Sequence, residues 1–592
     1  MAQPVRGGSF LARCAAAIAL AGSPAAAGAA PVEVGELALR LDGTLRYNLG
    51  LRTDPIDARL GATPAFTAGE WSVERGHLST HRLDLLLELD AALRERVGLR
   101  ASGAGWYDDA YRAGEVSRSP ALVAAGVPGT YLDDELSPVT LRRHRGPHAE
   151  VLDAFAWARL DAGPVPVTVK AGRHTVTWGE SLMLGGAVHG IAYAQAPLDL
   201  QKGFATPGVE AKELFRPLAA VSVQAQLLPS LSAAGQVFLE WQPSLYPEGG
   251  TFLGAGDAGF SGPDGTFRTV GGNTAFLPND GVHWAPDRGE WGVALRWAPE
   301  PLGGTLGLHY RRATDKLAGV FVTANPGGVG PLSPAVPSPF RYGQYFGERM
   351  DLVGVSLARQ LLGASVGAEV VWRHHAPLLA QNPAFAVAPA PPLAAALFPH
   401  GAPRLVDGSY QARGDTLHGL LNAVGVLGAV PGVDTLAWAV EATWSRWLAV
   451  DENRDVFFAE GYGVCRPDPA LAGAGLARRV RDGCATRQSF AVSAGLTPTW
   501  FRVASGVDLS APLSASWTID GNSPVAFGGN EGSGTFGAGL AADVRGRYRV
   551  DLRYTDFFGR LRDDGATVTS TNGQLAILRN RGSVTLTAKA TF

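Results

Sequence analysis

Apolar residues alternate with polar ones along much of the chain. Between Leu37 and Arg52 every odd position is apolar or small, whereas the even positions include Arg40, Asp42 and Arg46. Neighbouring side chains of a strand point to opposite faces, so this pattern predicts a strand with one apolar and one charged face. The segment is longer than a usual soluble strand. Its length suits a tilted strand that crosses a membrane and continues past it.

The same alternation recurs as far as the last residue. Trp291 and Trp297 flank one such segment, as an aromatic girdle at the two membrane interfaces would require. The final segment ends on Phe592, and it resembles the C-terminal signal that is read by the machinery that assembles outer-membrane barrels. We therefore expect that machinery as a partner. Other segments with this pattern are 82–91, 233–241, 366–372, 536–544, 548–554 and 583–592.

These strands predict an all-β fold, a transmembrane antiparallel β-barrel of about 16 strands, with about 14 to 18 compatible with the pattern. No apolar run approaches the ~18 residues of a membrane-spanning helix. A soluble β-sandwich would also show alternation. Dense charges of both signs on the polar faces, together with the terminal Phe592, favour a barrel surrounded by outer-membrane lipids.

The start of the chain has the three parts of a secretory signal peptide. Arg6 and Arg13 precede a short apolar stretch, and a zone of small residues ends at Ala30. We expect residues 1–30 to be cleaved and residues 31–592 to form a barrel in the outer membrane of a Gram-negative bacterium. The formal net charge of −3 argues against nucleic acid as a partner, because that binding needs clustered positive charge.

Connections between the strands fall into two kinds. Short ones such as 298–301 and 360–363 predict periplasmic turns, and segments rich in Gly, Pro and Asn predict extracellular loops. Cys465 and Cys484 lie in the last of these loops, where export to an oxidising compartment favours a disulfide. Two unpaired thiols are the alternative. The predicted loops are 53–76, 108–148, 243–288, 313–348, 375–434 and 449–486.

One segment, 179–216, lacks the alternation. A short helix at 210–215 is predicted after Pro207-Gly208. Because the segment is apolar for a surface loop, we expect it to fold into the lumen as a plug or constriction. An extracellular loop with a helical turn is the alternative. Candidate residues of the plug are Trp178, Glu180, Asp199, Lys202, Glu210 and Glu213.

Charged residues on the polar faces are candidates for the lumen lining. Facing charges pair where water is limited, so we expect chiefly a network of ion pairs that holds the wall. A selectivity lining that contacts solutes is compatible with such a network. The candidates are Arg40, Arg46, Arg82, Asp84, Glu88, Arg545, Arg549, Asp551 and Arg553.

The sequence offers weak candidates for chemistry. Gly179-Glu180-Ser181 lacks the second glycine of a nucleophile elbow. His374-His375 has no third ligand at metal spacing. We therefore expect no catalytic residue, no metal site and no cofactor.

Four stretches carry a family resemblance. They are Gly69-Glu70-Trp71 with the segment to Asp90, Gly172-Arg173-His174 with Trp178-Gly179-Glu180-Ser181, Gln195-Ala196-Pro197-Leu198-Asp199 with Glu210-Ala211-Lys212-Glu213-Leu214, and Tyr554 with Phe557-Phe558-Gly559 and the closing strand. With these stretches the chain resembles a large proteobacterial outer-membrane family catalogued as domain-of-unknown-function family 1302. The segment 375–434 departs from the family pattern.

The resemblance implies a function in transport. Members of the family tend to be encoded near permeases of the resistance-nodulation-division superfamily and near a periplasmic protein similar to lipoprotein-sorting factors. This implies a barrel that transports hydrophobic or lipid-like small molecules across the envelope with such partners. A general diffusion porin for polar solutes and a structural or adhesive barrel are the alternatives. An open lumen with opposed charge ladders would favour the porin, whereas a lumen blocked by 179–216 with an apolar pocket beside it would favour the hydrophobic transporter.

Overall fold

A computed structural model describes residues 32–206, 209, 211–270, 273–325, 340–380, 395–428 and 430–592. The predicted signal peptide and Glu210 lie outside the described residues. No helix among the described residues is long and apolar enough to cross a membrane.

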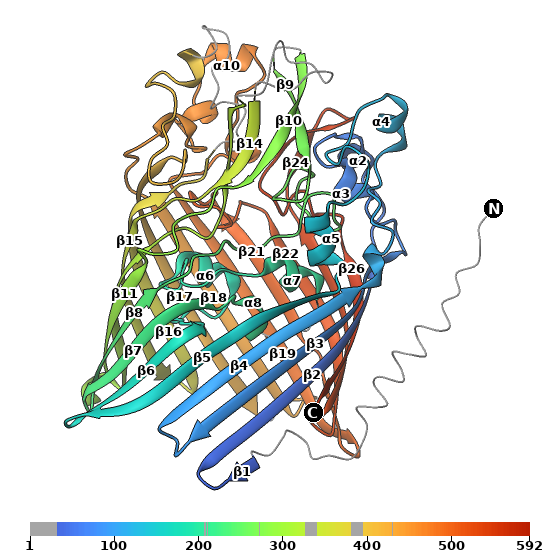
Figure 1. Cartoon of the computed structure of the whole chain (residues 1–592). Coiled ribbons are helices and arrows are strands. Elements are labelled where there is room, and N and C mark those ends of the chain that lie inside the picture. Colours follow the sequence, from blue (N-terminus) through green and yellow to red (C-terminus); the bar gives the residue numbers. More distant parts are fainter. Residues whose placement is uncertain are drawn as a thin grey trace.

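The described chain forms a closed antiparallel barrel, which confirms the predicted fold (Figure 1). The wall has 18 strands, the upper end of the predicted range. Closure is made by β26 (Ser583–Thr591), which pairs with β2 (Leu37–Arg52) in an antiparallel register. Two short strands, β20 (Val507–Ser510) and β21 (Leu513–Asp520), form one wall strand that is interrupted before Leu513.

The remaining wall strands follow one another round the barrel in chain order. They are β3 (Leu78–Leu93), β4 (Val97–Asp108), β5 (His148–Ala162), β6 (Val165–His174), β7 (Leu218–Leu228), β8 (Leu231–Phe238), β11 (Trp291–Trp297), β12 (Gly304–Ala313), β15 (Met350–Leu361), β16 (Ala364–Pro377), β17 (Arg413–Gly428), β18 (Thr435–Trp447), β19 (Gln488–Ala504), β22 (Gly534–Val544) and β23 (Tyr548–Phe558). A three-residue strand, β1 (Val32–Val34), extends the sheet beside β2.

The outer face of the wall is apolar. Alternate strand residues point outward and are exposed, among them Leu41, Leu87, Val293, Val355, Leu421, Val550 and Leu552. Exposed aromatic residues mark strand ends, with Trp291 and Trp297 at the two ends of β11. In a closed sheet the backbone N–H and C=O groups of every strand form hydrogen bonds within the protein. The apolar belt presents hydrocarbon side chains to lipid, so both requirements of a membrane-spanning barrel are met.

The two ends of the barrel differ. Short turns, including those at 298–303 and 362–363, lie at the end that also holds β1 and the C-terminus (Figure 1). We call this the turn end. The opposite loop end carries the long connections, with α2 (Ala58–Ala62), α3 (Thr67–Trp71), α4 (Pro120–Ala124), α5 (Pro138–His144), α10 (Pro469–Gly473) and a four-stranded sheet of β9 (Gly265–Val270), β10 (Asn273–Val282), β13 (Gly319–Ala324) and β14 (Phe340–Tyr345).

One predicted loop was wrong. The segment 375–434 contains the wall strand β17, which pairs with both β16 and β18. Its alternation is obscured because its inner face carries the apolar Leu420, which is buried. Leu420 points at the segment inside the barrel, where its Cδ1 lies 2.6 Å from the position of a Cβ built on Gly186. An inward apolar residue therefore marks contact with a plug rather than a loop.

The lipid-facing assignment predicts the effect of a charge in the belt. Leu552 lies in the middle of β23 with 48% of its surface exposed. We expect Leu552→Arg to lower the free energy of unfolding from lipid vesicles by about 2–4 kcal/mol, because the charge enters hydrocarbon. Urea titration of the folded fraction measures this. The control Leu405→Arg, at a loop residue that is 58% exposed, should leave the midpoint unchanged, and equal effects would contradict the assignment.

Candidate functional site: a plug inside the barrel

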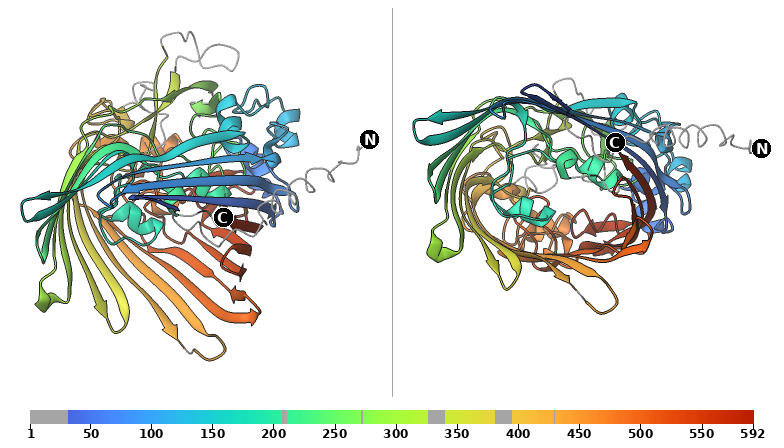
Figure 2. Two further views of the ribbon diagram at one scale, coloured as in Figure 1. Left: turned by 60° about the horizontal axis from the view of Figure 1, so that its bottom comes forward. Right: turned by 90° about the horizontal axis from the view of Figure 1, so that it is seen from below.

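The connection between β6 and β7, residues 175–217, lies inside the barrel rather than over its rim. It contains α6 (Leu184–His189), α7 (Leu200–Ala205) and α8 (Ala211–Leu214). Figure 1 places these helices within the wall, and the view from below in Figure 2 shows them across the lumen. We call the described part of 175–217 the plug. Asp199 starts α7, because its carboxylate accepts a hydrogen bond from the Lys202 amide at 2.8 Å.

Two wall carboxylates bind backbone N–H groups of the plug. Glu369 of β16 accepts from the amides of Glu180 and Ile191, the latter at 2.6 Å. Glu441 of β18 accepts from the amides of Leu182 at 2.7 Å, Met183 at 3.3 Å and Gly186 at 2.8 Å. Both carboxylates are buried, with 2% and 3% of their surface exposed. Glu441 thus satisfies amides at and just before the start of α6, including that of Gly186, which has no partner within the helix, and Glu369 binds the chain on either side of the helix.

Two wall guanidinium groups bind carbonyl groups of the plug. Arg373 of β16 donates to the Val188 carbonyl at 2.7 Å. Arg311 of β12 donates to the carbonyls of Ile191 at 2.9 Å and Tyr193 at 2.7 Å. The Arg373 guanidinium also lies 3.9 Å from the centre of the Tyr193 ring. Carbonyls at and beyond the C-terminus of α6 thus receive charged donors, which form stronger hydrogen bonds than neutral ones.

Side-chain ion pairs fix the other half of the plug. Glu213, in α8, pairs with Arg46 of β2 at 2.5 Å, and both side chains are buried. Lys202, in α7, pairs with Glu150 of β5, and its ammonium lies 5.1 Å from the Trp106 ring centre. These contacts lie on strands β2 to β5, whereas the contacts of α6 lie on β12 to β18. The plug therefore spans the lumen between two parts of the wall.

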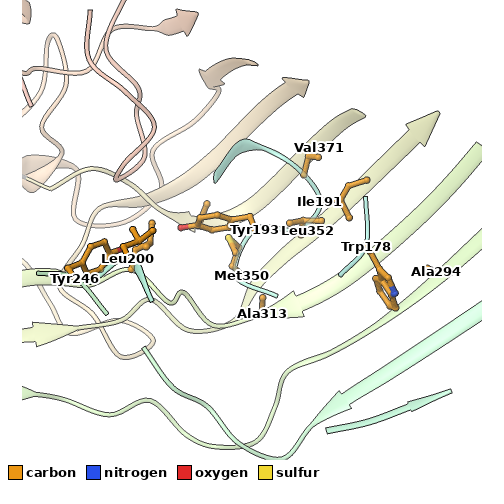
Figure 3. Close-up of a cluster of buried hydrophobic side chains, with 13 residues drawn as sticks. Trp178, Ile191, Tyr193, Leu200, Tyr246, Ala294, Ala313, Met350, Leu352 and Val371 are labelled. Atoms are coloured by element: carbon orange, nitrogen blue, oxygen red, sulfur yellow. The ribbon is translucent and has the colours of Figure 1, made fainter. Parts of the chain in front are cut away.

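An apolar cluster fills the space between α6, α7 and one part of the wall (Figure 3). Trp178, Ile191 and Leu200 of the plug pack with inward residues of the wall strands. The wall contributes Ala294, Ala313, Met350, Leu352 and Val371. Ile191 lies directly over Gly354, where an added Cβ would stand 2.5 Å from Ile191 Cγ1. The inner face of β11 to β16 is thus partly apolar.

A pair of histidines joins the plug to β17. The Nδ1 atoms of His189 and His418 are 3.0 Å apart, so one ring donates to the other. His189 Nε2 lies 3.1 Å from the Gly528 carbonyl, and His418 Nε2 lies 2.9 Å from the Thr416 hydroxyl. Both rings are buried.

The predicted plug residues other than Glu210 take part in these contacts. Trp178 is buried in the apolar cluster, and its amide donates to Gln195 at 2.8 Å. Glu180 contributes its backbone, since its amide binds Glu369 and its carbonyl accepts from Asn422.

The predicted lumen residues other than Arg545 make polar contacts along the inner face of the wall. On β3 and β4, Arg82 pairs with Asp84 at 2.8 Å and Glu88 pairs with Arg100 at 2.5 Å. Arg40 pairs with Asp42 at 2.7 Å, Arg549 pairs with Asp551 at 3.0 Å, and Arg553 donates to Ser514 at 2.9 Å.

Arg545 corrects one of these assignments. It lies in the exposed turn between β22 and β23 with a φ of 55°, and not on the inner face of the wall. β22 ends at Val544, as the alternation over 536–544 predicts, so Arg545 belongs to the turn that follows and not to the wall.

Four wall residues central to the plug were not singled out from the sequence: Arg311, Glu369, Arg373 and Glu441. A signal was present for Glu369 and Arg373, since each follows an outward apolar residue of a predicted strand. Nothing in the alternation distinguishes a charge that binds the plug from one that faces water.

The loop end has its own buried ion cluster. Glu70, in α3, pairs with Arg52 at 2.5 Å and with Arg581 at 2.9 Å, and all three side chains are fully buried. Asp257 accepts from the amides of Ala68 at 2.6 Å and Gly69 at 2.8 Å. Burial raises the pKa of Asp257 to about 6, and these amide hydrogen bonds oppose the shift. The cluster ties three loops to the rim.

A disulfide joins Cys465 and Cys484 in the loop between β18 and β19. Both residues are buried in an apolar cluster that includes Leu378, Phe457 and Leu471. The bond therefore lies within a packed part of the loop end.

Comparison with known proteins identifies a family. Residues 10–592 match the family described as "Protein of unknown function (DUF1302)". No curated protein matches the chain.

Solved outer-membrane channels are similar over most of the chain but at low scores. OccAB1 of Acinetobacter baumannii is 9% identical with a TM-score of 0.39, and 94% of this chain and 96% of that chain are covered. OpdK of Pseudomonas aeruginosa with vanillate is 9% identical with a TM-score of 0.36, covering 94% and 98%. The channel DcaP of Acinetobacter baumannii is 8% identical with a TM-score of 0.34, covering 96% and 100%. Similarity at this level carries no inference about function.

The role of Glu441 predicts a local effect on the plug. Glu441→Gln replaces an oxygen acceptor by an NH₂ group that faces the amides of Leu182 and Met183. Hydrogen exchange of peptides covering 182–186 should accelerate by about 10–100-fold, because a charged hydrogen bond contributes about 1.5–3 kcal/mol. Mass spectrometry of the folded barrel measures this. Glu460→Gln, at an exposed loop residue, is the matched control, and unchanged exchange in Glu441→Gln would show that the carboxylate does not hold α6.

The pair of Arg46 and Glu213 predicts non-additive variants. Arg46→Met or Glu213→Gln alone leaves a buried charge without its main partner and should destabilise the protein by about 3–5 kcal/mol. The double variant removes both charges and should be more stable than either single variant. Urea titration in lipid vesicles supplies the four free energies of this cycle. Additive losses would mean that the two residues act independently.

Proposed function

The chain belongs to the family described as "Protein of unknown function (DUF1302)", and from its plugged barrel we propose that it conducts hydrophobic or lipid-like small molecules across the outer membrane. The plug acts as the gate of this pathway. The observation that carries the proposal is the apolar part of the lumen wall beside the plug. In this proposal the protein is a conduit and catalyses no reaction.

The apolar wall supplies a reason for the substrate class. Met350, Leu352 and Val371 face inward and are covered by the plug. A barrel that passes polar solutes through water has a polar interior. Apolar inward residues would instead be wetted at a cost of about 25 cal/mol per Å² if the plug moved away. An apolar solute in contact with them offsets that cost, so the open state favours hydrophobic molecules.

The attachment of the plug supplies a reason for gating. Its contacts to the wall are hydrogen bonds, ion pairs and apolar packing, and no disulfide joins plug and wall among the described residues. Each charged group can be hydrated when the segment moves, as in other loops that close over a site. A solute or a periplasmic partner that binds the displaced state would shift the population towards it.

The family resemblance adds partners to the proposal. A resistance-nodulation-division permease and a periplasmic protein similar to lipoprotein-sorting factors would supply energy and carry the solute between the membranes. The barrel is then the outer-membrane part of a trans-envelope route. The turn end of the barrel, where the Arg40 side chain is 56% exposed and that of Arg549 is 40% exposed, faces such a carrier in this arrangement.

A reversible crosslink tests the gate. A Cβ built on Gly185, in α6, lies 3.8 Å from Thr443 Cγ2 on β18, so Gly185→Cys with Thr443→Cys places two thiols within disulfide reach. In cells whose outer membrane lacks other routes, oxidation of the double variant should abolish uptake of the neutral hydrophobic dye N-phenylnaphthylamine. Reduction should restore uptake. Each single variant, treated identically, controls for reduction of the natural disulfide.

A second arm separates the hydrophobic conduit from a porin. Purified barrel in vesicles should pass arabinose slowly, whether oxidised or reduced. Rapid arabinose flux that the crosslink stops would make the protein a gated porin for polar solutes. Dye uptake that is unchanged by the crosslink would show that the plug does not gate the pathway.

A further inference from the structure

A pocket lies on the inner face of the wall near the turn end, on the side of β2 to β5. The view from below in Figure 2 looks into this end of the barrel. Ala38 of β2, Ala92 of β3 and Trp157 of β5 line the pocket, together with the charged Arg40 and Asp90. It is open on one side and has room of about 150 Å³. A cavity of this size in another protein binds benzene.

Small residues at paired positions of neighbouring strands form the recess. Ala38 is directly opposite Ala92, and Ala92 is directly opposite Gly98 of β4. The next strand places Trp157 opposite Gly98. A Cβ built on Gly98 would lie 2.6 Å from Cε2 and Cζ2 of Trp157, so the indole lies over the Gly98 backbone. Gly98 has no positive φ that would require glycine, and the missing side chain is explained by the space that the indole takes.

Trp157 is an aromatic residue that faces the lumen. Aromatic girdles of membrane barrels face the lipid interfaces, whereas barrel interiors are polar. Trp291 and Trp297 follow this rule, since both are exposed on the outer face. Contact with the plug does not explain Trp157 either, because the apolar cluster beside the plug does not include it among the described residues. An indole beside a recess of small residues is accounted for if an apolar molecule occupies the recess.

The two charged residues that line the pocket are each paired. Arg40 pairs with Asp42 at 2.7 Å, and Asp90 pairs with Arg100 at 2.6 Å. An ion that entered the pocket would lose hydration without gaining an unpaired charge from its lining. The lining therefore favours a neutral molecule. An aromatic ring gains more than an aliphatic one here, because aromatic pairs attract each other beyond the area that they bury.

We propose that this pocket binds the ring of a neutral aromatic molecule, which contacts Trp157 and lies over Ala38 and Ala92. As a station for conducted molecules at the turn end of the lumen, the site rests on the proposed function and narrows its substrates to molecules with such a ring. Binding itself can be measured without transport.

Protection of a cysteine tests binding. Ala38 lines the pocket and is partly exposed, and the two cysteines in the described chain are joined in a disulfide. In Ala38→Cys, benzyl alcohol should slow modification by methyl methanethiosulfonate by about threefold or more. Cyclohexylmethanol, which has no aromatic ring, and benzoate, which is charged, should protect clearly less at the same concentration.

A cysteine elsewhere on the wall is the control. Ser510→Cys, on β20 near the turn end, should react at one rate with and without each compound. Protection of both cysteines by benzyl alcohol, or equal protection of Ala38→Cys by all three compounds, would overturn the proposal.

Two further variants test the contacts in the Ala38→Cys background. Trp157→Ala should weaken protection by about three- to tenfold, because an aromatic contact is lost. Trp517→Ala, at a residue 49% exposed on the outer face of β21, should leave protection unchanged.

Filling the recess is the second variant. Ala92→Leu should abolish protection, whereas Ala101→Leu, on the outer face of β4 opposite Leu89, should not affect it. Folding of each variant is verified by its heat-modifiable mobility. Undiminished protection in folded Trp157→Ala and Ala92→Leu would overturn the assigned site.

The two proposals fail separately. Protection without crosslink-sensitive dye uptake would support the binding site and contradict the conduit. Crosslink-sensitive dye uptake without protection would support the conduit and contradict the site.

Discussion

Every peptide group that enters the lumen must find a hydrogen-bond partner, and this constraint governs the structure of the plug. The short helix α6 leaves amides and carbonyls unpaired at its two ends. Glu441 accepts from amides at the start of α6, and Arg373 donates to the Val188 carbonyl at its end. Glu369 and Arg311 bind amides and carbonyls of the chain on either side of the helix. The dependence is mutual, because these four buried wall charges have the plug backbone as partner. Plug and wall therefore form one folded unit.

The lumen is divided by this arrangement into different environments. On β2 to β5, charged side chains pair with one another or with the plug, as in Arg82 with Asp84 and Arg46 with Glu213. On β11 to β16 the inward positions include Met350 and Leu352, which need apolar cover. The plug has Glu213 on one side and Ile191 on the other, so it fits the lumen in one orientation. A displaced plug would expose a polar and an apolar surface together.

The barrel could be predicted from the sequence because each strand carries its own evidence. Alternation along Leu37 to Arg52 identifies an inner face without knowledge of the neighbouring strands. β17 was missed because Leu420 breaks this rule where the wall meets the plug. Arg46 and Glu213 were each predicted, but their pairing depends on how the plug crosses the lumen, which no local pattern encodes. The same holds for Glu70 and Arg581, which lie 511 positions apart in the chain.

The polar attachment of the plug is itself an argument for movement. Buried ion pairs often stabilise a fold no more than apolar residues of the same volume do. Apolar contacts alone would therefore close the lumen as firmly, without the cost of burying charges. If the wall presented only apolar residues to the plug, its inner surface would have no polar groups to bind water after the plug moved away. Wall residues such as Glu441 and Arg373 can bind water in that state and the plug backbone in the other. A segment held in this way can leave the wall and return to the same position, which a permanent stopper would not require.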